Sequence, residues 1–350
     1  MSNIIAEKMN AVQLTGHGGF EVLNYTTEAE TPKPKQDQVL IRVKAAGVNN
    51  TDINTRIGWY SKGDKASEDA SWGGNALEFP RIQGADVCGE IVAVGNNIDA
   101  ERIGERVLVE PCLSQVEGSR PDVPWYIGSE CNGGFAQYVV VDSVHAYSIN
   151  SSMTDIELAS FPCSYSTAEN MLTRSKLAQG ERVLISGASG GVGSAAIQLA
   201  KARGAYVIAI TSPSKQQQVL ELGADQVVNR SDFLPDVLGE NSVDVVIDLV
   251  AGSAWPQFLQ VLRPKGRYAV SGAIGGAMVE LDVRTLYLKD LSFFGCTVLE
   301  PEVFRNLVSH IEQGAIKPLV AQTFPLEKIQ LAQEFFLEKG HVGKVVLTVS

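Results

Sequence analysis

The stretch Val183-Leu-Ile-Ser-Gly-Ala-Ser-Gly-Gly-Val-Gly-Ser194 decides how this chain folds. Its first three residues are apolar and two of them are β-branched, which is typical of a strand buried on both faces. Glycines follow, and apolar residues then recur at helical spacing from Val192 to Ala202. The stretch therefore predicts a strand, a glycine turn and a helix, in that order.

The glycine turn predicts a binding site for a dinucleotide. Such a turn lets the backbone approach a pyrophosphate, and the N–H groups at the start of the helix favour that anion. The usual fingerprint has three glycines, but Ala188 takes the first position here. A plain tight turn is the alternative. A second strand at 206–211 follows at the spacing of a βαβ unit, so we expect the pyrophosphate at Ala188, Ser189, Gly190, Gly191, Val192 and Gly193.

The end of the second strand indicates which cofactor binds. NAD enzymes place Asp or Glu there, about 20 residues after the first glycine, to bind the ribose hydroxyls. This chain has Ile210-Thr-Ser-Pro-Ser-Lys215, without an acid. Hydroxyls and a lysine would hold the 2′-phosphate that a carboxylate would repel. We therefore predict NADPH, with Ser212, Lys215 and Arg230 at the phosphate. The alternative is that the two cations are solvated surface residues.

Composition and charge limit the function classes. The chain has 350 residues, enough for two domains. Its net charge is −11, and it has no basic stripe, so nucleic acid is not an expected partner. No apolar run approaches the ~20 residues of a membrane helix, and no signal peptide is evident, so we expect a cytoplasmic protein without membrane contact. The five cysteines are scattered and form no CxxC motif.

The pattern of expected secondary structure divides the chain into two parts. Residues 1–150 are β-rich and include a polar, glycine-rich stretch, 61–78, which we expect to be an exposed loop. Strands and helices alternate over 151–310, which predicts an α/β domain with a doubly wound parallel sheet. The tail, 311–350, is expected to complete the first domain. The cleft between the domains would then be the site of a small-molecule substrate.

Several short motifs stand out along the chain, and they are Ala46-Gly-Val-Asn-Asn-Thr-Asp52, Gly84-Ala-Asp-Val-Cys-Gly-Glu-Ile-Val-Ala-Val-Gly95, Gly133-Gly-Phe-Ala-Gln-Tyr138, the turn at 188–193, Leu222-Gly-Ala-Asp225 and Gly343-Lys344. Together they resemble the motifs of the medium-chain dehydrogenase/reductase superfamily, and most closely its zinc-independent quinone oxidoreductase branch. The resemblance covers nearly the full length. It implies an N-terminal catalytic domain of the chaperonin-10-like (GroES-like) β-barrel type, a Rossmann domain, and a homodimer or homotetramer. Family dimers pair Rossmann edge strands, here Leu291–Val298, although a covered edge strand is an equal alternative.

The positions that correspond to zinc ligands are mostly occupied by other residues. In the resemblance, Asn49 stands at the first Cys position, Ala85 at the His position and Asp86 at the Glu position, while Cys163 keeps the last Cys. A catalytic zinc needs about three protein ligands. The four-cysteine structural lobe is also absent from the sequence. We predict no metal, leaving open residual zinc binding at Asp86 and Cys163.

The same resemblance suggests candidate catalytic residues. Asn49 and Asp52 match the family's Asn-x-x-Asp positions, and Tyr60 stands where relatives often have a tyrosine near the substrate. We expect Tyr60 to donate a proton or hydrogen bond, Asn49 to orient substrate or nicotinamide, and Asp52 to support the site structurally. The alternatives are a packing role for Tyr60 and a turn or cap role for Asp52. Lys344 matches a lysine that reaches toward the cofactor or cleft in some relatives, with a surface lysine as the alternative.

These features favour an NADPH-dependent oxidoreductase that transfers hydride to a quinone, an enone or a similar activated double bond. Without a Lewis acid, alcohol oxidation is difficult because nothing lowers the pKa of the alcohol. Reduction needs only a donor for the developing anion and a proton. A zinc-type alcohol dehydrogenase is the second hypothesis. The third is an NADPH-binding protein with little catalysis.

Overall fold

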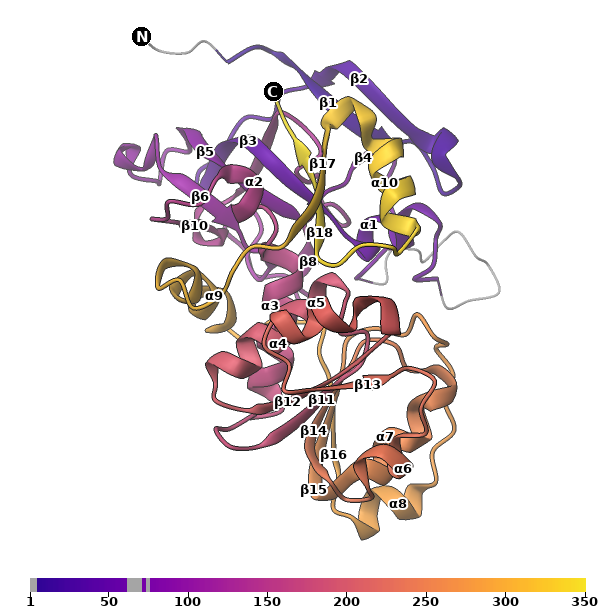
Figure 1. Ribbon diagram of the computed structural model, residues 1–350. Helices are drawn as coiled ribbons and strands as arrows, with labels where there is room; N and C mark the ends of the chain where they lie inside the picture. Colours follow the sequence, from indigo (N-terminus) through magenta and orange to yellow (C-terminus); the bar gives the residue numbers. More distant parts are fainter. Residues whose placement is uncertain (1–4, 62–70, 74–75) are drawn as a thin grey trace. The chain divides into compact units, whose positions relative to one another are not determined.

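The computed structural model describes residues 5–61, 71–73 and 76–350, and these divide into two compact units (Figure 1). Unit 1 comprises 1–163, 318–340 and 344–350, and unit 2 comprises 164–317 and 341–343. The sequence places these limits at 150 and 311. Helix α2 (Asp155–Leu158) lies between the expected and the observed limit, and it belongs to unit 1 because it packs against β3, β5, β17 and β18 of that unit. Most of the expected loop at 61–78 lies outside the described residues.

Unit 1 is built around one long strand, β3 (Gln38–Val48). This strand pairs antiparallel with β5, β9 and β18, and β17 extends the sheet from β18, so the sheet includes two strands from the C-terminal tail. A smaller sheet has the order β2-β1-β4. The strands are β1 (Lys8–Leu14), β2 (Leu23–Glu30), β4 (Arg81–Ile82), β5 (Asp86–Val94), β6 (Arg106–Val109), β7 (Cys112–Leu113), β8 (Trp125–Tyr126), β9 (Tyr138–Asp142), β10 (Ala146–Ser148), β17 (Val320–Pro325) and β18 (Lys344–Thr348).

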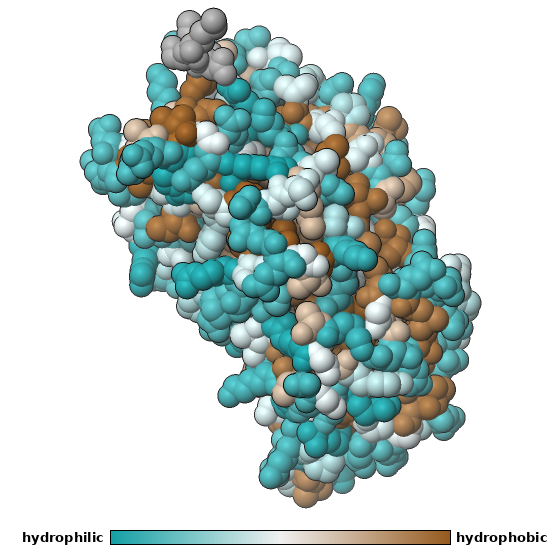
Figure 2. Space-filling model, turned by 60° about the vertical axis from the view of Figure 1, so that its left-hand side comes forward, coloured by the Kyte–Doolittle hydropathy of each residue, from teal (hydrophilic) through white to brown (hydrophobic). Residues whose placement is uncertain are grey.

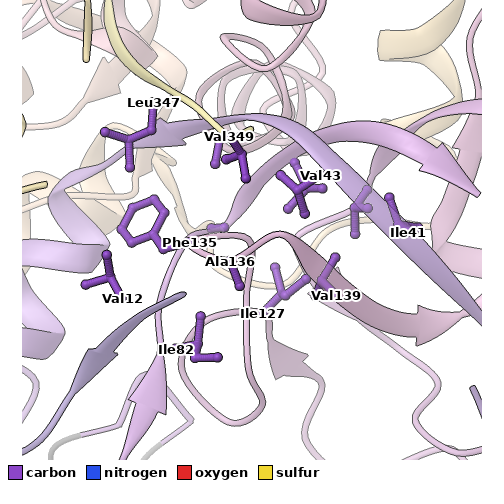
Figure 3. Close-up of a cluster of buried hydrophobic side chains, with 14 of the residues drawn as sticks. Val12, Ile41, Val43, Ile82, Ile127, Phe135, Ala136, Val139, Leu347 and Val349 are labelled. Atoms are coloured by element: carbon purple, nitrogen blue, oxygen red, sulfur yellow. The ribbon is translucent and has the colours of Figure 1, made fainter. Parts of the chain in front are cut away.

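Alternate side chains of these strands form the core of unit 1. Figure 3 shows aliphatic side chains from β1, β3, β9 and the tail gathered in one cluster together with Phe135, which has no exposed surface. Isoleucine and valine predominate because β-branched side chains pack well on a pleated surface. The core therefore depends on strands from both ends of the chain, which holds β18 in register beside β3.

Unit 2 has a six-stranded parallel sheet with the order β13-β12-β11-β14-β15-β16. Figure 1 shows α4 and α5 on one side of this sheet and α7 and α8 on the other. This is the predicted doubly wound arrangement, and its strand order reverses between β11 and β14. The strands are β11 (Arg182–Ile185), β12 (Tyr206–Thr211), β13 (Gln226–Asn229), β14 (Val243–Asp248), β15 (Leu262–Val270) and β16 (Ser292–Gly295).

The helices follow from apolar spacing and from residues that favour helix ends. Proline begins α3 at its first position, where a missing N–H costs nothing. The helices are α1 (Asn50–Arg56), α3 (Pro162–Arg174), α4 (Gly191–Ala202), α5 (Gln216–Glu221), α6 (Leu234–Leu238), α7 (Trp255–Val261), α8 (Val283–Leu288), α9 (Val303–Glu312) and α10 (Ile329–Leu337). In the described part of the chain, none of the helices has the length and apolar character needed to cross a membrane. On the face that Figure 2 shows, hydrophilic residues predominate and apolar residues form smaller groups.

The close approach of α4 to the preceding turn predicts a stability effect. A Cβ atom on Gly193 would lie 2.3 Å from the carbonyl oxygen of Gly187, so Gly193→Ala must push the helix from the turn. We expect a loss of about 1–3 kcal/mol in the free energy of unfolding. Gly295→Ala is the control, because a Cβ atom there meets open space. Equal unfolding midpoints in urea for the two variants would contradict this reading.

Candidate active site

The turn between β11 and α4 exposes backbone at the start of a 12-residue helix. Gly187 has φ +59°, which favours glycine, and Gly193 lies against its carbonyl. The first turn of a helix leaves N–H groups without intrahelical acceptors. Here that turn comprises Gly191, Val192 and Gly193, of which the first two are partly exposed. A pyrophosphate therefore fits the turn both electrostatically and sterically.

The predicted pyrophosphate residues do not all have the same surroundings. Ser189 and Gly190 are accessible at the outer side of the turn. Ala188 is fully buried, and its N–H donates to the carbonyl of Ile210 at 3.2 Å. This hydrogen bond joins the turn to β12. The N–H of Ala188 is therefore already used, and an anion would have to bind the N–H groups of the residues that follow it. The predicted contact of Ala188 with a cofactor stays a prediction.

The three residues predicted at the 2′-phosphate lie together at the carboxyl ends of β12 and β13. The hydroxyls of Ser212 and Ser214 are 3.1 Å apart. Arg230 N–H donates to the carbonyl of Thr211, the last residue of β12, at 3.1 Å. Partial burial, and then the positive charge of Arg230, lower the pKa of Lys215. Two cations that repel each other in this way gain from a shared anion.

Lys215 also has a partner near the C-terminus. Its Nζ donates to the carbonyl of His341 at 3.0 Å, and 341–343 belong to unit 2 although they adjoin β18. The contact orients the lysine at the end of β12. This hydrogen bond counts against the alternative that Lys215 is a fully solvated surface cation. Arg230 is exposed, which agrees with the same alternative for that residue.

A buried ion pair lies at the centre of the candidate catalytic residues of unit 1. Asp86 is 0% exposed and Lys344 is 2% exposed, and Lys344 Nζ lies 2.7 Å from Asp86 Oδ2. The amide of Asn49 bridges them, because its Nδ2 donates to Asp86 at 2.9 Å and its Oδ1 accepts from Lys344. The backbone N–H of Cys163 donates to the other carboxylate oxygen. Lys344 is therefore not a surface lysine.

Asp52 supports the start of α1. Its carboxylate accepts the N–H of Asn49 at 2.7 Å and the N–H of Gly84 at 3.3 Å, which holds two loops together. Burial raises the pKa of Asp52 to about 7, and the nearby charge of Asp86 acts in the same direction. The carboxylate caps a helix, as the alternative interpretation expects, and its contacts are to backbone rather than to another side chain.

Tyr60 lies in the turn that follows α1, beside Trp59, whose ring centre is 5.5 Å away. Burial raises the pKa of the phenol, and hydrogen bonds from Thr51 and Asn54 only partly oppose that effect. The phenol is therefore protonated at neutral pH and able to donate. Both neighbours come from α1, the helix that begins at the buried pair.

The sequence reasoning missed Tyr126. Its hydroxyl lies 2.9 Å from the Sγ of Cys163, and its ring stacks on Trp72 at a centroid distance of 4.9 Å. Burial, and then the charge of Asp86, raise the pKa of the Cys163 thiol to about 12, so it is not a nucleophile at neutral pH. Tyr126 is a second phenol beside the buried pair. Only a three-dimensional contact identifies it, because β8 has no motif of its own.

The donor atoms at this site do not fit zinc. Asn49 presents an amide, Ala85 presents no donor, and the Asp86 carboxylate already pairs with an ammonium that would repel a dication. Among the described residues, no group of three or more His, Cys, Asp or Glu side chains is arranged to hold a metal ion. The expected absence of a metal nevertheless stays a prediction.

Comparisons with known proteins match a family model to each of the two units. Residues 35–151 match the family model described as "Alcohol dehydrogenase GroES-like domain", and residues 191–313 match "Zinc-binding dehydrogenase". The chain is 31% identical to the quinone oxidoreductase of Homo sapiens over 97% of each chain. The chain belongs to the medium-chain dehydrogenase/reductase superfamily of oxidoreductases. It is also 29% identical to the acryloyl-coenzyme A reductase of Metallosphaera sedula, over 97% of this chain and 100% of that protein.

Solved structures give the same family. A putative alcohol dehydrogenase from Sinorhizobium meliloti 1021 has a TM-score of 0.92 at 43% identity, covering 99% of this chain and 98% of that chain. The quinone oxidoreductase of Coxiella burnetii has a TM-score of 0.79 at 26% identity, covering 98% and 100%. The Rossmann and GroES-like folds are therefore confirmed, while the names of these relatives differ in their substrates.

Removing the ammonium from the buried pair should be costly. Lys344→Met would leave the Asp86 carboxylate without a counter-charge in a site that water does not reach. We expect a loss of about 3–5 kcal/mol in the free energy of unfolding. Lys8→Met is the matched control, because the Lys8–Glu30 pair is exposed and should contribute less than about 1 kcal/mol. Urea denaturation of both variants measures the difference in the free energy of unfolding. Equal losses would show that the buried Asp86 carboxylate does not need its counter-charge for stability.

Proposed function

We propose that this protein is an NADPH-dependent reductase of quinones, enones or similar activated double bonds that works without a metal. The observation that carries the proposal is the pairing of Lys344 with Asp86 and Asn49. Asp86 stands at one of the positions that hold zinc ligands in the resemblance. Its carboxylate is instead paired with the ammonium of Lys344. A hydride acceptor that needs only hydrogen-bond donors suits such a site better than an alcohol does.

The choice of NADPH is supported by the end of β12. Ser212, Lys215 and Arg230 present hydroxyls and cations where an NAD enzyme has an acid. The pyrophosphate would bind the first turn of α4, at the glycines described above. When bound, the dihydronicotinamide supplies a hydride. The residues of unit 1 then have to stabilise the anion that forms and provide one proton.

We assign the proton to Tyr60. The phenol is neutral at physiological pH, as an ordinary tyrosine is, and burial raises its pKa further, while Thr51 and Asn54 hydrogen-bond to it. It donates a hydrogen bond to the oxygen on which negative charge develops, and the proton passes to the reduced product. Asn49 and Asp52 hold the surrounding loops, and Lys344 contributes a fixed positive charge.

The relatives support this class of acceptor. The human relative is named a quinone oxidoreductase, and the relative from Metallosphaera sedula is named an acryloyl-coenzyme A reductase. The solved relative from S. meliloti is named a putative alcohol dehydrogenase, which supports the second hypothesis. Oxidation of alcohols upon addition of zinc would favour that hypothesis. Binding of NADPH without turnover would favour a protein with little catalysis.

We also propose a cytoplasmic homodimer that acts on a small molecule rather than on nucleic acid or membrane. β16 (Ser292–Gly295) lies at the open end of the sheet order and falls within 291–298, where a second copy would pair. An edge strand presents unpaired backbone groups, which antiparallel pairing with its symmetry mate would satisfy.

The cofactor preference can be measured directly. Wild-type protein should bind NADPH at least about tenfold more tightly than NADH, because charge-assisted hydrogen bonds to the 2′-phosphate contribute about 1.5–3 kcal/mol. Lys215→Ala and Arg230→Ala should each reduce the preference for NADPH over NADH. Arg263→Ala is the control, since Arg263 lies at the amino end of β15. Calorimetric titration that finds equal affinities in wild type would refute the preference.

The proton donor can be tested by kinetics with NADPH against 1,4-benzoquinone, an alkenal and a cyclic enone. Tyr60→Phe should lower kcat about 100-fold or more while leaving NADPH affinity unchanged, because only proton donation is lost. Tyr126→Phe is the comparison, because that phenol already bonds to Cys163. A large loss in Tyr126→Phe and none in Tyr60→Phe would transfer the role to Tyr126.

A further inference from the structure

Asp248, the last residue of β14, is a carboxylate with no exposed surface in unit 2. Its Oδ1 accepts the hydroxyl of Ser186 at 2.5 Å and the N–H of Val250 at 3.0 Å. Its Oδ2 accepts the phenol of Tyr268 at 2.6 Å. Both oxygens accept the N–H of Ala251, at 3.1 and 3.2 Å. The proposed hydride-transfer chemistry uses none of these groups.

The place of this cluster in the sheet is informative. Ser186 follows β11 directly, Asp248 ends β14, and Tyr268 comes from β15. The strand order reverses between β11 and β14, and open parallel sheets bind ligands outside the carboxyl ends at that point. The carboxylate therefore ties three neighbouring strands together under the expected ligand position.

The carboxylate also fixes a turn that the chain would not adopt easily. Ala251 has φ +55° and ψ −138°, a conformation unfavourable for a residue with a side chain. Its N–H donates to Asp248, and Leu249 N–H donates to Ser186 at 2.8 Å. Residues 249–251 are thus held by hydrogen bonds to two side chains, Asp248 and the Ser186 that donates to it.

A second loop rests on this turn. Gly275 N–H donates to the carbonyl of Val250 at 2.7 Å, and Gly252 N–H donates to the carbonyl of Gly276 at 3.1 Å. A Cβ atom on Gly275 would lie 2.8 Å from Val250, and one on Gly187 would lie 3.2 Å from the same side chain. A shift of the 249–252 turn would therefore disturb both the 272–276 loop and the glycine turn after β11.

The order of the strands indicates which half of a dinucleotide would lie over the loops 249–252 and 272–276. The pyrophosphate is expected at the turn after β11, and the adenosine phosphate at the end of β12. The remaining half of a dinucleotide must then extend to the other side of β11, where β14 and β15 end. There Leu249 and Val250 are partly exposed and 272–276 are partly or fully exposed, whereas Ala251 and Gly252 are buried beneath them.

We propose that Asp248 is a positioning residue that holds 249–252 and 272–276 as the platform for the nicotinamide half of the cofactor. The inference rests on the proposed function, since it takes NADPH as the ligand. It predicts that Asp248 governs one half of the cofactor and leaves the other half unaffected. Ser186 and Tyr268 share the role because each donates to the same carboxylate.

The test compares NADPH with 2′,5′-ADP, which carries the adenosine 2′-phosphate but no nicotinamide. In calorimetric titrations of the full chain, Asp248→Ala should weaken NADPH binding at least about tenfold and change 2′,5′-ADP binding less than about twofold. Asp248→Asn, which keeps an acceptor oxygen, should restore most of the NADPH affinity. Asp244→Asn is the control on the same strand, because Asp244 bonds to Arg182 at the amino end of β14.

Each other outcome has a definite meaning. Equal weakening of both ligands, or weakening of neither, would overturn the positioning role while leaving NADPH as cofactor. Failure of the wild-type protein to bind either ligand would overturn the proposed function and the inference with it. If Asp248→Ala does not fold, Ser186→Ala and Tyr268→Phe each remove one hydrogen bond and should show the same selective loss in smaller measure, and a loss shared by both ligands would count against the proposal.

Discussion

A carboxylate that is removed from water must be paired, and this constraint shapes the candidate site in unit 1. Asp86 satisfies it with three donors, from Asn49, Lys344 and the backbone of Cys163, which come from widely separated segments of the chain. Such a pair is costly to break, because either partner alone is an uncompensated buried charge. The start of α1, the start of α3 and the tail strand β18 are therefore held at one point.

Unit 2 uses a buried carboxylate for a different purpose. Within the described part of the chain, Asp248 accepts hydrogen bonds from two hydroxyls and two backbone N–H groups rather than from a cation. Hydroxyl and amide donors fix backbone, whereas an ammonium supplies net charge. This contrast matches the proposed division of work, in which unit 2 holds a cofactor by its backbone and unit 1 acts on the substrate with side chains.

The sequence predicts unit 2 well because its signals are local. The apolar run at 206–211 predicts a strand, and the structure has β12 at the same residues. The partners of Lys344 could not be predicted in this way, since lysines are mostly exposed and Asp86 is remote in sequence. Tyr126 and the Asp248 cluster were missed for the same reason. A buried polar group is recognised by the contacts that satisfy it, and these form only when distant strands meet.

The buried lysine also bears on the kind of reaction that the site can support. A catalytic metal binds an alcohol oxygen directly and lowers its pKa, which prepares the alcohol to lose a hydride. Lys344 cannot act in that way, because its ammonium already donates to Asp86 and Asn49. Its charge can only contribute to the electrostatic field around an anion that forms nearby. The phenol of Tyr60, whose pKa burial raises further above neutral pH, would under the proposed function donate to such an anion. These features are the reason that we propose hydride transfer to an acceptor rather than hydride removal from an alcohol.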